Sequence, residues 1–236
     1  MAGFVTTQWS LVVAAGNENT SVAQDALATL YATYWYPLYA YVRRRGRPAE
    51  DARDVVQAFF LSLLERRDFG RLAREQGRFR AFLLASLKHF LANDFARRQA
   101  LKRGGGANPC ALSLDGAEAR YAREPADSMT PEMLYERRWA LTVIDQVLIT
   151  IRSEWRHQGR EQVFDELRDC LLGTRPRGGY AETAARLAMS EGAVKTAVHR
   201  LRRRFQTELQ HRVAETLSEP DDADDEIRSL IRALHA

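Results

Sequence analysis

The stretch GYAETAARLAMSEGAVKTAVHRLRRRF, residues 179–205, contains two helical patterns separated by a short turn. In the first pattern Ala184, Leu187 and Ala188 offer small or apolar side chains for a close helix crossing. Ser190 is suited to cap the second helix. With about 100° between successive helical residues, one apolar sector of that helix contains Ala193, Val194, Ala197, Val198, Leu201 and Phe205. The stretch therefore predicts two helices joined at a tight turn.

The opposite side of the second helix is basic. Lys195, Thr196, His199 and Arg203 lie there, with Arg200 at the flank. Arginine and lysine can donate to guanine O6 and N7, and threonine and histidine can contact bases or phosphates. Helix, turn and basic helix together predict a helix-turn-helix that enters a DNA major groove. The alternative is a structural helix whose basic face is merely solvated. We expect Arg204, which falls over the apolar sector, to extend its charge toward water.

The overall charge is basic but unevenly distributed. The chain has 236 residues and net charge +4, yet six carboxylates face only two arginines after Ser218. A basic body favours a polyanionic partner. The acidic end places Ile227, Leu230, Ile231 and Leu234 on one helical face. Two interpretations stay open: a helix that docks on a domain and masks its basic surface, or a small packing helix.

The remaining chain predicts an all-α protein, because helical periodicity dominates and no strand pattern alternates convincingly. One helical face crosses Pro37, where we expect a kink or a break. Turn-forming residues with weak periodicity predict a flexible linker over 106–131. We therefore expect helical domains at 1–105 and 132–212, joined by that linker, and an acidic helical extension at 213–236.

The cysteines and the first residues bear on location. Cys110 and Cys170 lie far apart without metal-ligand spacing, which favours free thiols in a reducing compartment. The opening MAGFVTTQWSLVVAAG lacks a basic region, and its apolar run is too short for a signal peptide or a membrane span. We expect a cytoplasmic protein without a membrane partner.

Two segments carry a family resemblance. LYATYWYPLYAYVRRRGRPAEDARDVVQAFFLSLLERRDF resembles domain two of bacterial sigma factors, and residues 179–205 are similar to domain four. The absence of other sigma domains points to the extracytoplasmic-function group. The resemblance implies a factor that binds core RNA polymerase and promoter DNA and directs transcription initiation.

The resemblance also implies roles for particular residues. The surface that docks on the clamp helices of the polymerase largest subunit corresponds to Asp54, Gln57, Phe60 and Leu61. His89 and Asn93 stand where the family captures a base flipped from the minus-ten element. The positions that read the minus-thirty-five element match Lys195, Thr196, His199 and Arg200, while Arg203 would hold phosphate.

Further phosphate contacts could come from a basic set in the third helical segment: Arg80, Lys88, Arg97 and Arg98. The aromatic residues of that segment are either core or base-stacking platforms: Phe79, Phe82, Phe90 and Phe95.

An enzyme is the weakest hypothesis for this chain. GTRPRGG lacks the Lys-Ser/Thr of a phosphate-binding loop, and no His and carboxylate cluster has metal-ligand spacing. We expect no catalytic residue, metal or cofactor. The serious alternative is a helix-turn-helix regulator that binds duplex DNA without joining polymerase. Control by an anti-sigma protein, by phosphorylation or by the acidic extension stays open.

Overall fold

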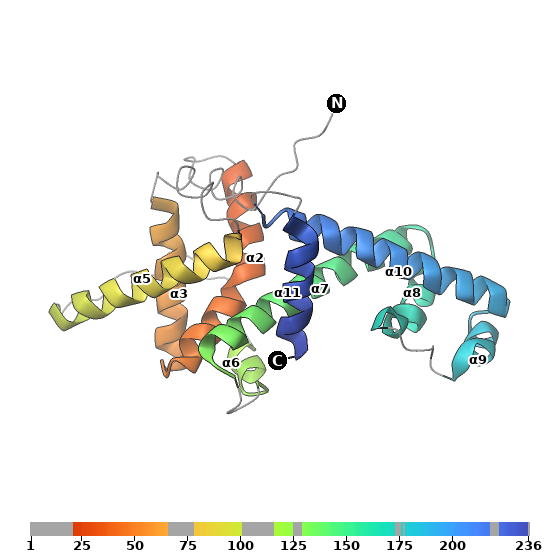
Figure 1. The fold of residues 1–236 in the computed structure, drawn as a ribbon, viewed down its shortest axis with the longest axis horizontal. Helices are drawn as coiled ribbons and strands as arrows, with labels where there is room; N and C mark the ends of the chain where they lie inside the picture. The colour runs from red at the N-terminus through yellow and green to blue at the C-terminus, as the bar shows by residue number, and fades with distance from the viewer. Residues whose placement is uncertain are drawn as a thin grey trace. The chain divides into compact units, whose positions relative to one another are not determined.

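The structure, a computed structural model, describes residues 21–65, 78–100, 116–124, 129–172, 176, 178–217 and 222–235, with side chains except at 21–27, 64–65, 94–100 and 172. Within these ranges the protein is all-α, as predicted, and has no strand; Arg78 and Leu217 form one isolated antiparallel bridge (Figure 1). The elements are α2 (Ser21–Arg44), α3 (Ala49–Glu65), α5 (Phe79–Ala100), α6 (Ala117–Tyr121), α7 (Pro131–His157), α8 (Glu161–Leu167), the 3-10 helix η2 (Arg168–Leu172), α9 (Gly179–Arg186), α10 (Glu191–Ala214) and α11 (Ala223–His235).

The chain divides into two compact units. Unit 1 combines Met1–Ala140 with Ala214–Ala236, and unit 2 is Leu141–Val213. Unit 2 therefore begins inside α7, whereas the sequence placed the second domain at 132–212. The acidic extension belongs to unit 1.

Aromatic side chains of α2 form the interior of unit 1. Tyr34 and Tyr39 have no exposed surface, and the Tyr34 ring lies 5.1 Å from that of Phe79 on α5. Helix α3 adds Phe59, whose ring lies 5.7 Å from that of Phe90. Helix α2 continues through Pro37, so the proline does not split it. Burial of the flanking aromatic residues offsets the hydrogen bond that proline cannot donate.

The described part of the predicted linker packs on α2. Glu118 of α6 accepts from Arg43 Nε at 3.0 Å and from the Tyr39 hydroxyl at 2.5 Å. Glu124, which is buried, accepts from the Tyr36 hydroxyl at 2.7 Å and pairs with Arg138. A helix of five residues has almost no periodicity, so the sequence pattern did not predict it.

Acidic helix α11 packs against the start of α5. Glu226 has no exposed surface, and its carboxylate pairs with Arg78 and Arg80. The chain just after α10 adds a backbone hydrogen bond of 3.0 Å from the amide of Phe79 to the carbonyl of Thr216. The acidic extension is thus a structural part of unit 1.

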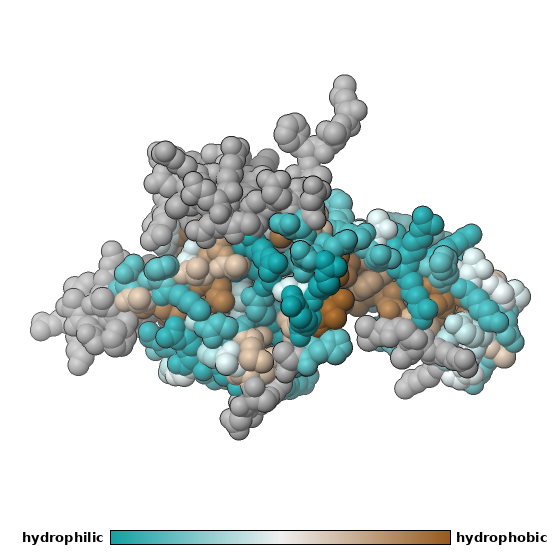
Figure 2. Space-filling model, in the orientation of Figure 1, coloured by the Kyte–Doolittle hydropathy of each residue, from teal (hydrophilic) through white to brown (hydrophobic). Residues whose placement is uncertain are grey.

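Unit 2 encloses a separate core beneath α10. Val194, Ala197, Val198 and Leu201 are buried. Other core residues come from α7, α8 and η2: Val147, Ile151, Trp155, Phe164, Leu167 and Cys170. Figure 2 shows mainly hydrophilic side chains on the visible face of α10. These apolar positions of α10 are the ones that the sequence assigned to its inner sector.

Candidate nucleic-acid interface

The turn between α9 and α10 is fixed by backbone hydrogen bonds. The amide of Met189 donates to the carbonyl of Ala184 at 2.9 Å, and that of Ala188 donates to Ala185 at 3.3 Å. This is the Schellman pattern, which needs a left-handed residue at its centre. Ala188 occupies that position with φ of 50°. Ser190 Oγ then accepts from the amide of Ala193 at 3.2 Å, as predicted for the cap of α10.

The structure brings the five predicted recognition residues to one face of α10. Their side chains are all exposed, whereas the apolar residues between them are buried: Lys195, Thr196, His199, Arg200 and Arg203. The Thr196 hydroxyl donates to the carbonyl of Gly192 at 2.9 Å, which leaves its oxygen lone pairs free to accept. A capped helix thus presents a continuous polar and cationic row.

Other cations of α10 have partners within unit 2. Arg202 Nε donates to the carbonyl of Cys170 at 2.9 Å. Arg204 pairs with Glu154 at 2.5 Å and with Glu208 at 2.9 Å. Because Arg204 finds these carboxylates, it does not simply extend into water as we expected. These arginines connect α10 to η2 and α7.

The cations on the exposed face of α10 have fewer partners than Arg202 and Arg204. Among the described residues, the side chains of His199, Arg200 and Arg203 make no ion pair or hydrogen bond. Lys195 lies 3.8 Å from Glu191 and 5.5 Å from the ring centre of Tyr180, both near the surface. The outer row is therefore available to an anionic ligand, while the inner arginines stabilise the unit.

The contacts inside unit 2 shift the pKa values of its ionisable side chains. The hydrogen bond from Arg204 lowers the pKa of Glu154, and the same bond raises the pKa of Arg204. Burial raises the pKa of the Cys170 thiol, which is free and buried. Cys110, the other predicted free thiol, lies outside the described residues.

The predicted polymerase surface on α3 is only partly exposed. Asp54 is exposed, Gln57 is half-buried, and Leu61 is 38% exposed. Phe60 is 3% exposed because its ring packs on Tyr31, with ring centres 5.2 Å apart, and beside Phe59. Phe60 therefore supports this surface from beneath and is not one of its outer contacts.

The residues predicted to contact the minus-ten element lie on α5. His89 and Asn93 are exposed. Arg97 and Arg98 belong to α5, but their side chains lie outside the described set. Lys88 pairs with Glu132 at 2.8 Å. Phe79 and Phe82 are buried, as expected for core residues.

Arg80 is not available for the predicted phosphate contact. It is buried between Glu226 and Glu136, and its guanidinium lies 4.8 Å from the ring centre of Trp139. The sequence pattern could not show these partners because they come from distant helices.

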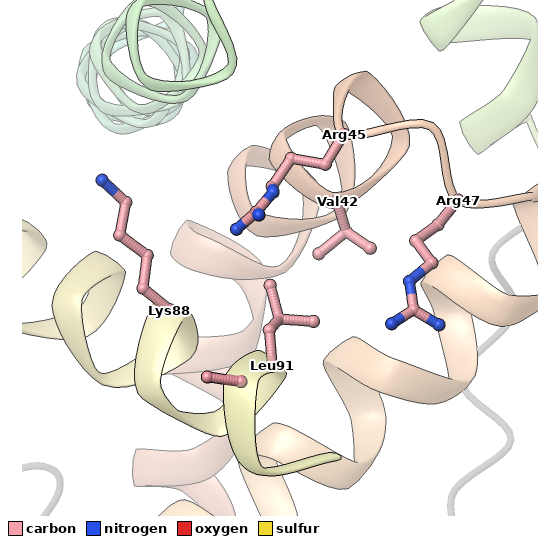
Figure 3. A pocket seen from close by; sticks show the side chains of 6 residues that line it. Val42, Arg45, Arg47, Lys88 and Leu91 are labelled. Carbon is pink, nitrogen blue, oxygen red and sulfur yellow. The ribbon is translucent and has the colours of Figure 1, made fainter. Parts of the chain in front are cut away.

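Sequence reasoning also missed two cations at the end of α2. Arg45 and Arg47 lie in the run RRRGR and line an open pocket with Lys88 of α5 (Figure 3). The density of arginine in that run was the signal that could have identified them.

Comparisons with protein-family models, curated proteins and solved structures find no match to this chain. Across the described residues, every helix is too short or too polar to cross a membrane.

Proposed function

We propose that the protein is an extracytoplasmic-function sigma factor, which binds core RNA polymerase and directs promoter-specific transcription initiation. The observation that carries the proposal is the exposed face of capped helix α10, where the side chains of His199, Arg200 and Arg203 make no ion pair or hydrogen bond among the described residues. The contacts that join α10 to the rest of unit 2 come from other residues, because Arg204 pairs with Glu154 and Arg202 donates to the carbonyl of Cys170. Duplex DNA offers the phosphates and base edges that such a row can bind.

The two units would then have separate tasks. Lys195, Thr196, His199 and Arg200 would read the minus-thirty-five element while Arg203 holds a phosphate. On α5, His89 and Asn93 would contact the opened minus-ten strand, with Arg97 and Arg98 on its backbone. Bond formation belongs to the polymerase, so the protein itself needs no catalytic residue or cofactor. Its place would be the cytoplasm.

The polymerase would dock on the outer side of α3. Asp54 and Leu61 are exposed there, and Gln57 lies at the edge. A partly apolar surface with a carboxylate is suited to a protein contact. The second candidate is a helix-turn-helix regulator, which would use the same α10 face but would leave the α3 surface without a partner. The two candidates therefore differ in polymerase binding.

The deciding experiment measures binding of the full chain to purified core RNA polymerase, followed by promoter-directed transcription. The test variant is Asp54→Ala/Gln57→Ala. Its matched control is Asp145→Ala/Gln162→Ala, which removes the same two residue types from exposed positions of unit 2. We expect the test variant to weaken polymerase binding at least about tenfold, and the control to bind like the wild type.

Two outcomes would overturn the proposal. If the wild-type chain binds promoter duplex but not polymerase, the regulator is the better account. If both double variants bind polymerase equally well, the α3 surface is not the docking site.

A further inference from the structure

Unit 1 contains an open basic pocket, and of its lining residues only Lys88 was considered above as a phosphate contact. Its walls are the end of α2 and the middle of α5, and its volume is about 480 Å³. Val42, Leu91 and Ala92 provide an apolar floor, while Arg45, Arg47 and Lys88 surround it (Figure 3). The pocket therefore combines hydrophobic surface with three cationic groups.

Hydrogen bonds to the backbone hold the turn on the α2 side of the pocket. Gly46 has φ of 86°, and its amide donates to the carbonyl of Arg43 at 2.9 Å. The amide of Arg47 donates to the carbonyl of Val42 at 3.4 Å, which completes a Schellman motif. Arg43 Nη1 donates to the carbonyl of Arg47 at 2.5 Å, and Arg43 is itself held by Glu118. The backbone of Arg47 is thus held beside Val42.

The charge of the pocket is only partly neutralised. Lys88 pairs with Glu132 at 2.8 Å. The guanidinium of Arg45 lies 5.9 Å from the ring centre of Tyr41, and its Nη1 is 3.4 Å from the Tyr41 hydroxyl. Within the described residues, the side chain of Arg47 has no hydrogen-bond or ion-pair partner. Two guanidinium groups therefore remain for an anion.

We infer that this pocket binds a nucleoside phosphate. Guanidinium groups form charge-assisted hydrogen bonds with phosphate oxygens and can also stack on a base. The pocket volume of about 480 Å³ falls in the range of small-molecule sites, roughly 300–1,000 Å³, and exceeds what a single phosphate group needs. The apolar floor accommodates the base and sugar. The ligand can be a free nucleotide or one unit of a single strand of nucleic acid.

The inference goes beyond the proposed function and concerns unit 1 alone. It requires neither polymerase nor the α10 face. Failure of polymerase binding would therefore leave it intact, and its own failure would leave the sigma proposal intact.

The test is methyl NMR on the full chain with three probes: inorganic phosphate, adenosine monophosphate and a short oligothymidylate. We expect the two nucleotide probes to shift the methyl signals of Val42 and Leu91 in a saturable manner. Inorganic phosphate should bind at least about tenfold more weakly, since it makes no contact with the apolar floor. If oligothymidylate binds more tightly than adenosine monophosphate, the ligand is a single strand of nucleic acid. If oligothymidylate binds equally or more weakly, the ligand is the free nucleotide.

Two variants and one control connect binding to the pocket. Arg45→Gln/Arg47→Gln removes both guanidinium groups of the pocket and should weaken nucleotide binding at least about tenfold. Ala92→Trp keeps every charge but fills the pocket from an exposed helix position, and it should also prevent binding. The control Arg123→Gln removes an exposed cation of unit 1 outside the pocket and should bind like the wild type.

Three results would overturn the inference. The first is the absence of a saturable shift at Val42 and Leu91 with either nucleotide probe. The second is equal affinity for inorganic phosphate and the monophosphate. The third is wild-type affinity in both pocket variants, with folding verified by circular dichroism.

Discussion

Arg80 Nε lies 2.5 Å from Glu226 Oε1, although 146 residues separate the two in sequence. Both side chains are buried, with exposed fractions of 5% and 0%. Arg80 Nη2 also lies 3.1 Å from Glu226 Oε2, so the contact is bidentate. A buried charge without a partner is costly, so this pair makes α11 and the start of α5 depend on each other.

Removal of Glu226 should therefore destabilise unit 1. We expect Glu226→Ala to lower the free energy of unfolding by about 3 kcal/mol, because Arg80 would remain buried with less compensation. Urea unfolding followed by circular dichroism measures this. The matched control is Asp225→Ala on the same helix turn, whose pairing with Arg228 is exposed and should contribute little to stability.

The same variant decides between the two interpretations of the acidic extension. Arg80 keeps Glu136 and Trp139 as neighbours after Glu226 is removed. We therefore expect no gain in affinity for duplex DNA in Glu226→Ala. A clear gain, measured by fluorescence anisotropy at conditions where the variant stays folded, would support the masking interpretation instead.

The outer arginines of α10 should contribute to duplex binding through phosphate or base contacts. Arg203→Gln should lower the slope of log affinity against log salt concentration by about 1, since one fewer counterion is released. Arg200→Gln should behave similarly if Arg200 contacts a phosphate in addition to a base. The control Arg168→Gln makes the same charge change at an exposed site on η2. An equal fall in the salt slope for this control would mean that binding is nonspecific.

The turn between α9 and α10 should tolerate glycine better than alanine at its centre. Ala188 has φ of 50°, a conformation that costs an alanine roughly 1–2 kcal/mol. We expect Ala188→Gly to raise the free energy of unfolding of unit 2 by about 0.5 kcal/mol, after the larger entropy of glycine in the unfolded chain is subtracted. Ala185→Gly, inside helix α9, should have the opposite sign. Thermal unfolding of the three proteins provides the comparison.

Attachment of α6 to α2 should weaken in acid. The hydrogen bond from Arg43, followed by that from Tyr39, lowers the pKa of Glu118 in the folded protein. A lowered folded pKa means that the carboxylate contributes stability above its unfolded pKa and loses it as the pH falls through the folded value. Amide hydrogen exchange of α6 should therefore accelerate below about pH 4.

The control for this pH dependence is Glu118→Gln. It cannot form the ion pair at any pH, so α6 should exchange faster at neutral pH and respond less to acid. An unchanged acid response in that variant would show that another group controls α6. At alkaline pH the relevant group is Tyr39, because burial and the hydrogen bond to Glu118 raise its pKa to about 12. The protonated hydroxyl therefore stabilises the folded protein fully below about pH 10, and this stabilisation is lost as the pH rises toward 12.

Local patterns of sequence were sufficient for the all-α fold and for the α9–α10 turn. Ser190, the buried alanines and valines, and the exposed Lys195 all follow from helical periodicity and capping, which act over a few residues. The family resemblance assigned Phe60 to a docking surface, and residue type assigned Arg80 to a phosphate. Residue type alone does not reveal Tyr31 over Phe60 or Glu226 beside Arg80, because those partners come from other helices. The pocket of Arg45 and Arg47 likewise depends on how α2 and α5 meet.

The division of unit 1 between two stretches of chain has a consequence for synthesis. All of unit 2 is translated before Glu226, so the chain from Leu141 to Val213 can fold while Arg80 still lacks Glu226 as a counter-charge. Unit 1 can reach its final packing only after the ribosome has released α11. The order of folding during translation should therefore reverse the order of the sequence, with the later unit complete first.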